Sequence, residues 1–186
     1  MLLNHEGRRV PQITVRVLTK GGRYDVSTAD LFAHKTVVVF AVPGAFTDPY
    51  SAIQLLGYNE YADVFRANGV DEIFCISVND PFSLAAWARE EGADQVHFIP
   101  DMNGDFTHAM GMMVNLSDKG MGYRSQRYSM LVKNNVIQKI FIEQEDFETM
   151  PVVSDAETLL NYINPDTEKP RQTTVLMQIW QTMLCT

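Results

Sequence analysis

The sequence predicts an α/β fold in which a central mixed sheet is covered by helices on both faces. Three observations predict it. Short apolar, β-branched runs alternate along the chain with longer segments of helical periodicity. The run at 37–42 is apolar at every position, which is typical of a central strand covered on both faces. The chain of 186 residues, 46% of them hydrophobic, suits one domain with a sizeable core.

The first part of the chain predicts a strand, a turn and a helix before the central strand. In order, these are a strand at 13–17, a turn at Gly21 and Gly22, a brief helix opening at 27–30 with a capping residue, and the strand at 37–42. Apolar residues then recur at helical spacing between 50 and 67. Asn68 and Gly69 are expected to end this helix.

The middle of the chain repeats the strand and helix alternation. Buried strands are expected at 72–78 and at 96–99. Between them, Asp80 is a suitable N-cap and Pro81 a suitable first helical residue for a helix that runs to about Glu91. Consecutive strands joined by helices indicate parallel neighbours in one sheet.

The last part of the predicted domain adds an antiparallel pair. A short helix is expected at 105–110, then a loop through Gly122. Strands at 127–132 and 136–142 form a predicted hairpin, and a last helix covers 154–163. The order β-α-β-α-β-α-β-β-α, with a hairpin at one edge of the sheet, matches a thioredoxin-like architecture.

Three segments divide the chain. Residues 1–163 form the predicted domain, 164–173 a polar linker bounded by prolines, and 174–186 a helical tail. The apolar residues of the tail recur at helical spacing and give it one apolar face: Val175, Leu176, Ile179, Trp180, Met183 and Leu184. Two interpretations stay open, a helix that folds back onto its own domain and a helix that contacts a second copy or another protein partner.

The loop between the strand at 37–42 and the following helix has a distinctive spacing. Pro43 and Thr47 fit the pattern Pro-x-x-x-Thr-x-x-Cys, and Tyr50 stands where this pattern has Cys. The loop resembles that of the peroxiredoxins. Further segments are similar to the peroxiredoxin-5 type, above all to the bacterial forms fused to a glutaredoxin: 58–60, 69–73, 77–80, 98–101, 103–107, 110–112 and 127–133. The resemblance covers roughly residues 8 to 163 and implies a thioredoxin-like fold and a homodimer.

The resemblance also implies a peroxide pocket. In that family a thiolate in the first turn of a helix attacks the peroxide, an Arg lowers the pKa of the thiol and polarises the peroxide, a Thr hydroxyl binds the peroxide, and a Pro shields the sulfur. Carried over by position, the pocket consists of Pro43, Gly44, Thr47, Tyr50 and Arg127. It needs no cofactor or metal.

Two departures from the pattern predict that the pocket has lost its chemistry. A phenol such as that of Tyr50 is almost fully protonated at neutral pH and cannot form a sulfenic acid. Asp48, followed by Pro49, reads as a helix start and puts a carboxylate where it can pair with Arg127. The sequence therefore predicts a pseudoenzyme without thiol-dependent peroxidase activity, which acts through binding or self-association. An alternative is that Arg127 and Thr47 are kept for packing.

Another cysteine is the alternative source of activity. Cys75 lies in an apolar strand and is expected to be a buried, inert residue. Cys185 is the penultimate residue, and no neighbouring base or basic residue would lower its pKa. The alternative function is thus a thiol-dependent peroxidase that reduces hydroperoxides through a relocated cysteine such as Cys185.

Composition excludes several other classes. The formal net charge is −8 and Lys and Arg form no cluster longer than a pair, so nucleic acid is not an expected partner. No apolar run is long enough for a membrane span, and the first residues lack the layout of a signal peptide. With two distant cysteines and no metal-ligand spacing, we expect a cytoplasmic protein without a bound metal. The acidic run at 143–146 is expected to be a solvated loop.

Overall fold

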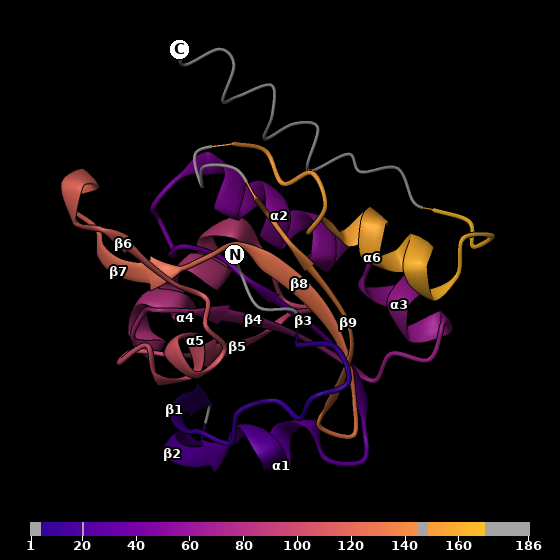
Figure 1. The fold of residues 1–186 in the computed structure, drawn as a ribbon, viewed down its shortest axis with the longest axis horizontal. Coiled ribbons are helices and arrows are strands. Elements are labelled where there is room, and N and C mark those ends of the chain that lie inside the picture. The colour runs from indigo at the N-terminus through magenta and orange to yellow at the C-terminus, as the bar shows by residue number, and fades with distance from the viewer. Residues whose placement is uncertain (1–4, 20, 145–148, 170–186) are drawn as a thin grey trace.

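A five-stranded mixed sheet forms the centre of the protein. The computed structural model describes residues 5–19, 21–144 and 149–169. The strand order is β5-β4-β3-β8-β9, with bounds His97–Pro100, Glu72–Ser77, Thr36–Ala41, Tyr128–Lys133 and Val136–Ile142 (Figure 1). β3, β4 and β5 are parallel, whereas β8 pairs antiparallel with both β3 and β9. The predicted mixed sheet is confirmed.

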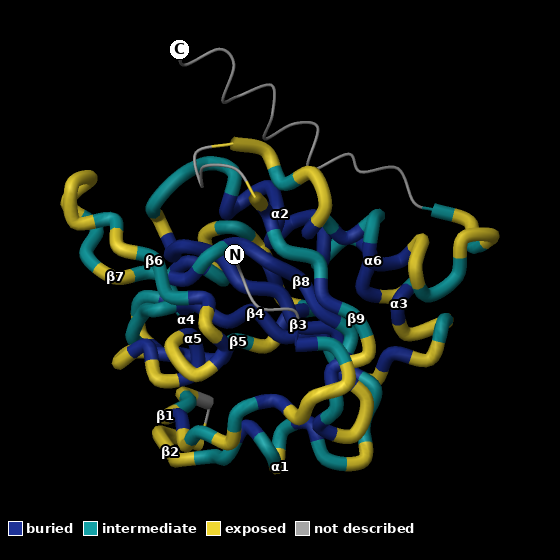
Figure 2. Tube along the Cα trace, viewed as in Figure 1, coloured by how far each residue is buried: buried dark blue, intermediate teal, exposed yellow. Residues whose placement is uncertain are grey.

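Helices cover both faces of this sheet, as the sequence predicts. One core cluster includes residues of four helices, α2 (Pro49–Glu60), α3 (Ala62–Ala67), α4 (Pro81–Glu91) and α6 (Ala156–Ile163). The other includes residues of α1 (Thr28–Phe32) and α5 (Asp105–Ala109). Alternate residues of β3 belong to the two clusters, Val38 and Phe40 to the first, Val37 and Val39 to the second. The central strands β3, β4 and β8, mostly dark blue in Figure 2, are therefore buried on both sides.

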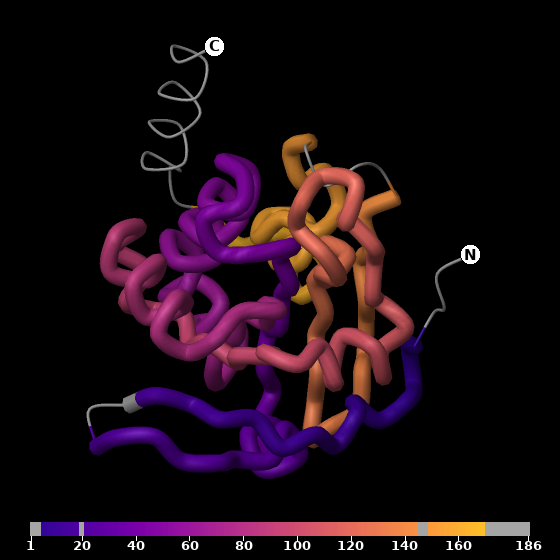
Figure 3. The backbone as a smooth tube through the Cα atoms, turned by 90° about the vertical axis from the view of Figure 1, so that its left-hand side faces the viewer, coloured from indigo at the N-terminus to yellow at the C-terminus, as the bar shows by residue number. Residues whose placement is uncertain are grey.

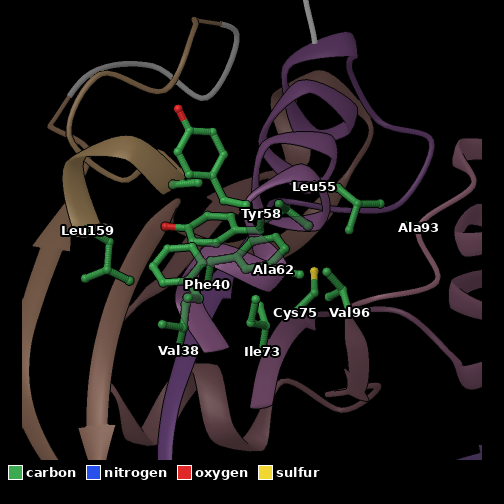
Figure 4. Packing of buried hydrophobic residues seen from close by; sticks show 14 of the residues in the cluster. Val38, Phe40, Leu55, Tyr58, Ala62, Ile73, Cys75, Ala93, Val96 and Leu159 are labelled. Carbon is green, nitrogen blue, oxygen red and sulfur yellow. The ribbon is translucent and has the colours of Figure 1, made fainter. Parts of the chain in front are cut away.

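Aromatic stacking joins α2 to the sheet. The rings of Phe40 on β3 and Tyr58 on α2 are stacked with their centroids 4.2 Å apart (Figure 4). Cys75 on β4 lies in the same cluster near Ala62 and Val96 and is fully buried. The prediction of a buried Cys75 is confirmed. This packing fixes α2 against the sheet and so fixes the loop that leads into it.

The structure corrects the predicted helix at 50–67. It is two helices, α2 and α3, separated at Tyr61, whose φ of −87° and ψ of 0° depart from helical values. The turn changes the direction of the chain so that Tyr61 and Phe65 both reach the core. Helical periodicity continues across the break, and for this reason the sequence pattern does not reveal it.

Two hairpins were not predicted in full. β1 (Thr14–Thr19) pairs with β2 (Gly22–Ser27), and Figure 3 shows this pair crossing below the sheet. β6 (Met113–Leu116) pairs with β7 (Gly122–Ser125) where a loop is predicted, with a short 3₁₀ helix at Ser117–Lys119 between them. β1 has the apolar alternation that predicts the strand at 13–17. β2 is mostly exposed and the four-residue strands β6 and β7 are mostly half-buried, so these three strands lack that signal.

The turn of the β8–β9 hairpin has the expected chemistry. Asn134 and Asn135 have φ values of 47° and 67°, the left-handed conformation that a two-residue hairpin turn requires and that Asn tolerates. The backbone N–H of Asn134 donates to the carbonyl of Lys35, which ties the turn to the start of β3. The predicted hairpin is confirmed.

Asp80 caps α4 as predicted, and its substitution tests the cap. Hydrogen bonds from the Ser83 hydroxyl, then from the backbone N–H groups of Ser83 and Phe82, lower the pKa of Asp80. A lowered folded-state pKa stabilises the protein above the unfolded pKa, and the effect is lost as pH falls through the folded value. Asp80→Ala is expected to reduce the free energy of unfolding by about 1 kcal/mol at pH 7. Urea titrations at pH 7 and pH 3 check this, since equal losses at both pH values would contradict it.

The end of the described chain stays close to the domain. Residues 164–169 of the predicted linker follow α6, and Asn68 binds both Asn164 and Thr167 through its side chain. The predicted tail at 174–186 lies outside the described residues. Among the described residues no helix is long and apolar enough to cross a membrane.

Candidate functional site

The loop between β3 and α2 holds the predicted pocket residues. Pro43 and Gly44 are buried, and Thr47 and Tyr50 are half-buried. A Cβ atom on Gly44 would collide with the Thr47 methyl group, so the loop needs glycine here. The Thr47 hydroxyl lies 2.8 Å from the Gly44 carbonyl oxygen and 2.9 Å from Oδ2 of Asp48, and its single proton serves one of them at a time.

Asp48 is the centre of the site. As N-cap of α2, its Oδ1 accepts from the backbone N–H of Ser51 at 2.8 Å, and its Oδ2 accepts from the Ser51 hydroxyl at 2.7 Å. Nη2 of Arg127 lies 3.3 Å from the same Oδ1. The side chain of Asp48 is 5% exposed and that of Arg127 is 2% exposed. The predicted ion pair between Asp48 and Arg127 is confirmed, and it is almost completely shielded from water.

Arg127 is held from a second side by an amide. Its Nη1 donates to Oε1 of Gln54, nearly two turns after Asp48 along α2, at 2.9 Å. Burial lowers the pKa of Arg127, and the negative charge of Asp48 opposes that shift. The guanidinium therefore binds both the N-cap of α2 and a residue within this helix. The interpretation that Arg127 has a structural carboxylate partner agrees with this geometry.

Gln54 connects this pair to the loop before α6. Its Nε2 lies 3.1 Å from the carbonyl oxygen of Ser154, and the Tyr58 hydroxyl donates to the same oxygen at 2.7 Å. Oε1 of Glu143 in turn accepts from the Ser154 backbone N–H at 2.8 Å and from the Ser154 hydroxyl at 2.9 Å. A continuous buried polar network thus runs from Asp48 to Glu143.

Glu143 is a correction to the sequence analysis. Instead of lying in a solvated loop it is 8% exposed, and its Oε1 also accepts from the backbone N–H groups of Val152 and Val153. The acidic residues that follow it in sequence conceal this role, because a charge run is usually solvated. Neither Gln54 nor Glu143 was among the predicted site residues, and nothing in their spacing would single them out.

Glu143→Ala is expected to destabilise the protein by about 2–3 kcal/mol, because three backbone N–H groups would lose their acceptor. Glu143→Gln retains an amide oxygen at the same place and is expected to cost less. Urea unfolding of the two variants beside the unaltered protein measures the difference. Equal stability of Glu143→Ala and the unaltered protein would show that the loop finds other acceptors.

Tyr50 is not part of this network. It is the second residue of α2 and packs against Ile53 and Leu56. Within the described part of the chain its hydroxyl makes no hydrogen bond. The loop brings together Gly44, Thr47, Asp48 and Arg127, and the carboxylate of Asp48, not the phenol, faces the guanidinium.

The described cysteine is unsuited to chemistry. Burial raises the pKa of the Cys75 thiol well above its ordinary value, which keeps it protonated and away from reactants. Cys185 lies outside the described residues. The described residues contain no group of three or more His, Cys, Asp or Glu side chains arranged to hold a metal ion.

A separate cavity of about 390 Å³ lies on another side of the molecule. It is bounded by the β1–β2 hairpin, the start of α4 and the loop after β5, and its lining includes Val15, Phe82 and Met102. The guanidinium of Arg23 lies 5.7 Å from the centroid of the Phe82 ring. None of the predicted pocket residues lines it, and the sequence did not indicate it because the β2 strand was not predicted.

Comparisons with known proteins agree with this fold. A family model described as Redoxin matches residues 5–160. A hybrid peroxiredoxin of Haemophilus influenzae is 50% identical over 160 residues, which are 86% of this chain and 66% of that protein, slightly under two thirds of its length. A peroxiredoxin of Synechocystis is 46% identical over 143 residues, 75% of this chain and 76% of the relative.

Solved structures give the same answer. The crystal structure of reduced Prx3 from Vibrio vulnificus in complex with hydrogen peroxide is 38% identical, has a TM-score of 0.81, and the match covers 87% of this chain and all of that one. Fold and site thus define a thioredoxin-like domain in which a buried arginine faces the start of a helix. With the matches above, the chain belongs to the peroxiredoxin family.

Proposed function

We propose that Tyr50 occupies the position at which other peroxiredoxins have their attacking thiol, and that this protein does not reduce hydroperoxides there. The ion pair between Asp48 and Arg127 is the observation that supports this most. Because the carboxylate of Asp48 pairs with the guanidinium of Arg127, the positive charge of Arg127 is neutralised and does not stabilise a thiolate or polarise a peroxide. The phenol of Tyr50 cannot replace the sulfur, because it forms no sulfenic acid.

In this proposal the protein acts through binding or self-association, as a cytoplasmic homodimer. Phe46 and Phe82 support an interface, because they are large apolar side chains that are 55% and 56% exposed. Sedimentation equilibrium over a range of protein concentrations tests the homodimer. A monomer at all concentrations would refute self-association.

A second candidate is a thiol-dependent peroxidase that uses another cysteine. The relatives favour this candidate over loss of activity, because they are named peroxiredoxins and one solved relative is described in complex with hydrogen peroxide. Loss of activity is supported only by the residues of the site. Since Cys75 is buried with a raised pKa, the thiol of this second candidate is Cys185.

Hydroperoxide consumption with dithiothreitol as reductant separates the two candidates. The unaltered protein, Cys185→Ser and Cys75→Ser are compared at equal concentration. If the first candidate is correct, none of the three proteins exceeds the reductant alone. Consumption by the unaltered protein that Cys185→Ser abolishes and Cys75→Ser retains would establish the second candidate and refute the first.

A further inference from the structure

One edge of the β1–β2 hairpin has no partner strand among the described residues. There, β1 pairs with β2 alone, and the two strands form a sheet of their own (Figure 3). The backbone N–H of Thr28 donates to the carbonyl of Ile13, so Ile13 faces β2. In an antiparallel pair every second residue faces the partner strand. The N–H and C=O groups of Thr14, Arg16 and Leu18 therefore point away from β2, and we call them the open edge of β1.

The open edge can accept an additional strand. Its backbone groups make no hydrogen bond to any other residue in the described part of the chain. Unpaired N–H and C=O groups along a strand are a template for another extended chain, which supplies the missing donors and acceptors. The occupant that completes this edge is therefore a polypeptide segment in β conformation.

The cavity of about 390 Å³ runs along this open edge. It is lined by four consecutive residues, 13–16, and side chains of successive strand residues point to opposite faces. A cavity that touches both sets of side chains lies along the edge of the strand, and β2 occupies the other edge. The opposite wall consists of residues 80–82 at the start of α4 and residues 100–103 after β5. The cavity thus leaves room for an extended segment beside β1.

One arginine at this cavity has no counter-charge in the described chain. Arg16 is paired with Asp25 through two hydrogen bonds of 2.8 and 3.1 Å. Arg23 makes no ion pair within the same residues. Its guanidinium lies over the ring of Phe82, which also lines the cavity and so holds this charge beside it.

The other carboxylates of the cavity are directed elsewhere. Asp80 caps α4, and both oxygens of the buried Asp101 accept backbone N–H groups of α5 and its first turn. Asp105 is in the first turn of α5, with its Oδ2 3.5 Å from the side-chain amide of Asn103. An acidic side chain on the occupant would therefore supply the carboxylate that Arg23 lacks.

We propose that the open edge of β1 binds an extended segment of a partner protein as an additional strand, with an acidic side chain of the segment on Arg23. Met102 lines the cavity and is 58% exposed, so it offers an apolar contact to a neighbouring side chain. Five extended residues are enough, because the edge from Thr14 to Leu18 spans about 14 Å. This goes beyond the proposed function, since the surface is separate from Asp48 and Arg127 and does not depend on activity there.

The charge of the site favours another protein over a second copy of β1. The strand Thr14–Thr19 contains no acidic residue and carries the cation Arg16. Two copies of β1 paired edge to edge would therefore leave Arg23 without a carboxylate from the added strand. A partner segment with one acidic residue among β-branched residues meets both requirements, strand formation and charge.

Binding of a synthetic peptide to the full-length protein tests the proposal. The probe is a fluorescein-labelled peptide of seven residues in which valine and threonine alternate around a central glutamate, and a second peptide has glutamine at the centre. Fluorescence anisotropy is expected to give a Kd below about 1 mM for the glutamate peptide. Arg23→Ala is expected to raise this Kd about tenfold without changing that of the glutamine peptide. The control Arg89→Ala removes an exposed cation at the other end of α4 and is expected to have no effect.

A second pair of variants tests the backbone contact. Thr14→Pro removes an outward N–H that β2 does not use, and the matched control Thr14→Val retains it. Thr14→Pro is expected to raise the Kd of both peptides about fivefold, and Thr14→Val to leave it unchanged. Circular dichroism verifies the fold, and if Thr14→Pro is unfolded the arginine variants decide.

Three results would overturn the proposal. In the first, the glutamate peptide does not bind at protein concentrations up to about 1 mM. In the second, Arg23→Ala weakens binding no more than Arg89→Ala does. In the third, the folded Thr14→Pro variant has a lower mass in sedimentation than the unaltered protein, which assigns the open edge to a second copy. None of these readouts requires peroxidase activity or its loss, so they are independent of the proposed function.

Discussion

The variant Tyr50→Cys, Asp48→Pro and Pro49→Thr is expected to consume hydrogen peroxide under a thiol reductant. The new sulfur lies in the first turn of α2, where the helix dipole and free N–H groups stabilise a thiolate. Replacement of Asp48 also removes the carboxylate that pairs with Arg127, which makes the guanidinium available to a peroxide or a thiolate at the start of α2. In hydrolases, loss of the nucleophile lowers kcat by a factor on the order of 10⁶. Even partial recovery of a nucleophile here should therefore raise peroxide turnover about a hundredfold above that of the unaltered protein.

The matched control has the same two loop changes with Tyr50→Ser. This control has the same loop sequence but no thiol. Any peroxide consumption of the cysteine variant above that of the serine variant is therefore due to the new sulfur. The rate is measured as loss of peroxide against reductant concentration. If both variants fold and consume no more peroxide than the unaltered protein, the pocket formed by Thr47 and Arg127 is not the site of the family's chemistry.

The core strands and the capped helices could be predicted from sequence because their signals are local. The run at 37–42 is apolar on both faces because β3 is covered on both faces. Asp80 with Pro81 marks the start of α4 by the chemistry of the first turn alone. The break at Tyr61 has no such signal because helical spacing continues across it. The hairpin of β6 and β7 has none because its strands are four residues long and mostly half-buried.

The site was predictable only where a motif or a charge rule applied. The pairing of Asp48 with Arg127 follows from a carboxylate placed at the start of a helix that faces the arginine. Gln54 and Glu143 could not be predicted as site residues. The partner of Gln54, Arg127, is 73 residues away in sequence, and Glu143 accepts from backbone N–H groups, which no side-chain pattern marks. That Tyr50 faces Ile53 and Leu56 rather than Arg127 follows from the rotation of α2, which the motif spacing does not give.

Asp48→Ala is expected to lower the free energy of unfolding by about 3–5 kcal/mol, because it leaves the buried charge of Arg127 without its carboxylate. The substitution also removes the N-cap of α2, which accounts for about 1 kcal/mol of this loss. Urea unfolding followed by circular dichroism measures it. The Arg127 side chain is only 2% exposed, so water does not replace the lost carboxylate.

Asp155→Ala is the control that isolates the ion pair. Asp155 caps α6 with nearly the same geometry, accepting from the Thr158 backbone N–H at 2.9 Å and from the Thr158 hydroxyl at 2.7 Å. It should therefore cost only the cap, about 1 kcal/mol. Equal losses for the two alanine variants would mean that the fold does not need the carboxylate of Asp48 to hold the charge of Arg127. A larger loss for Asp48→Ala would mean that the carboxylate which closes the pocket also holds the buried arginine in the fold, so activity and stability compete at one residue.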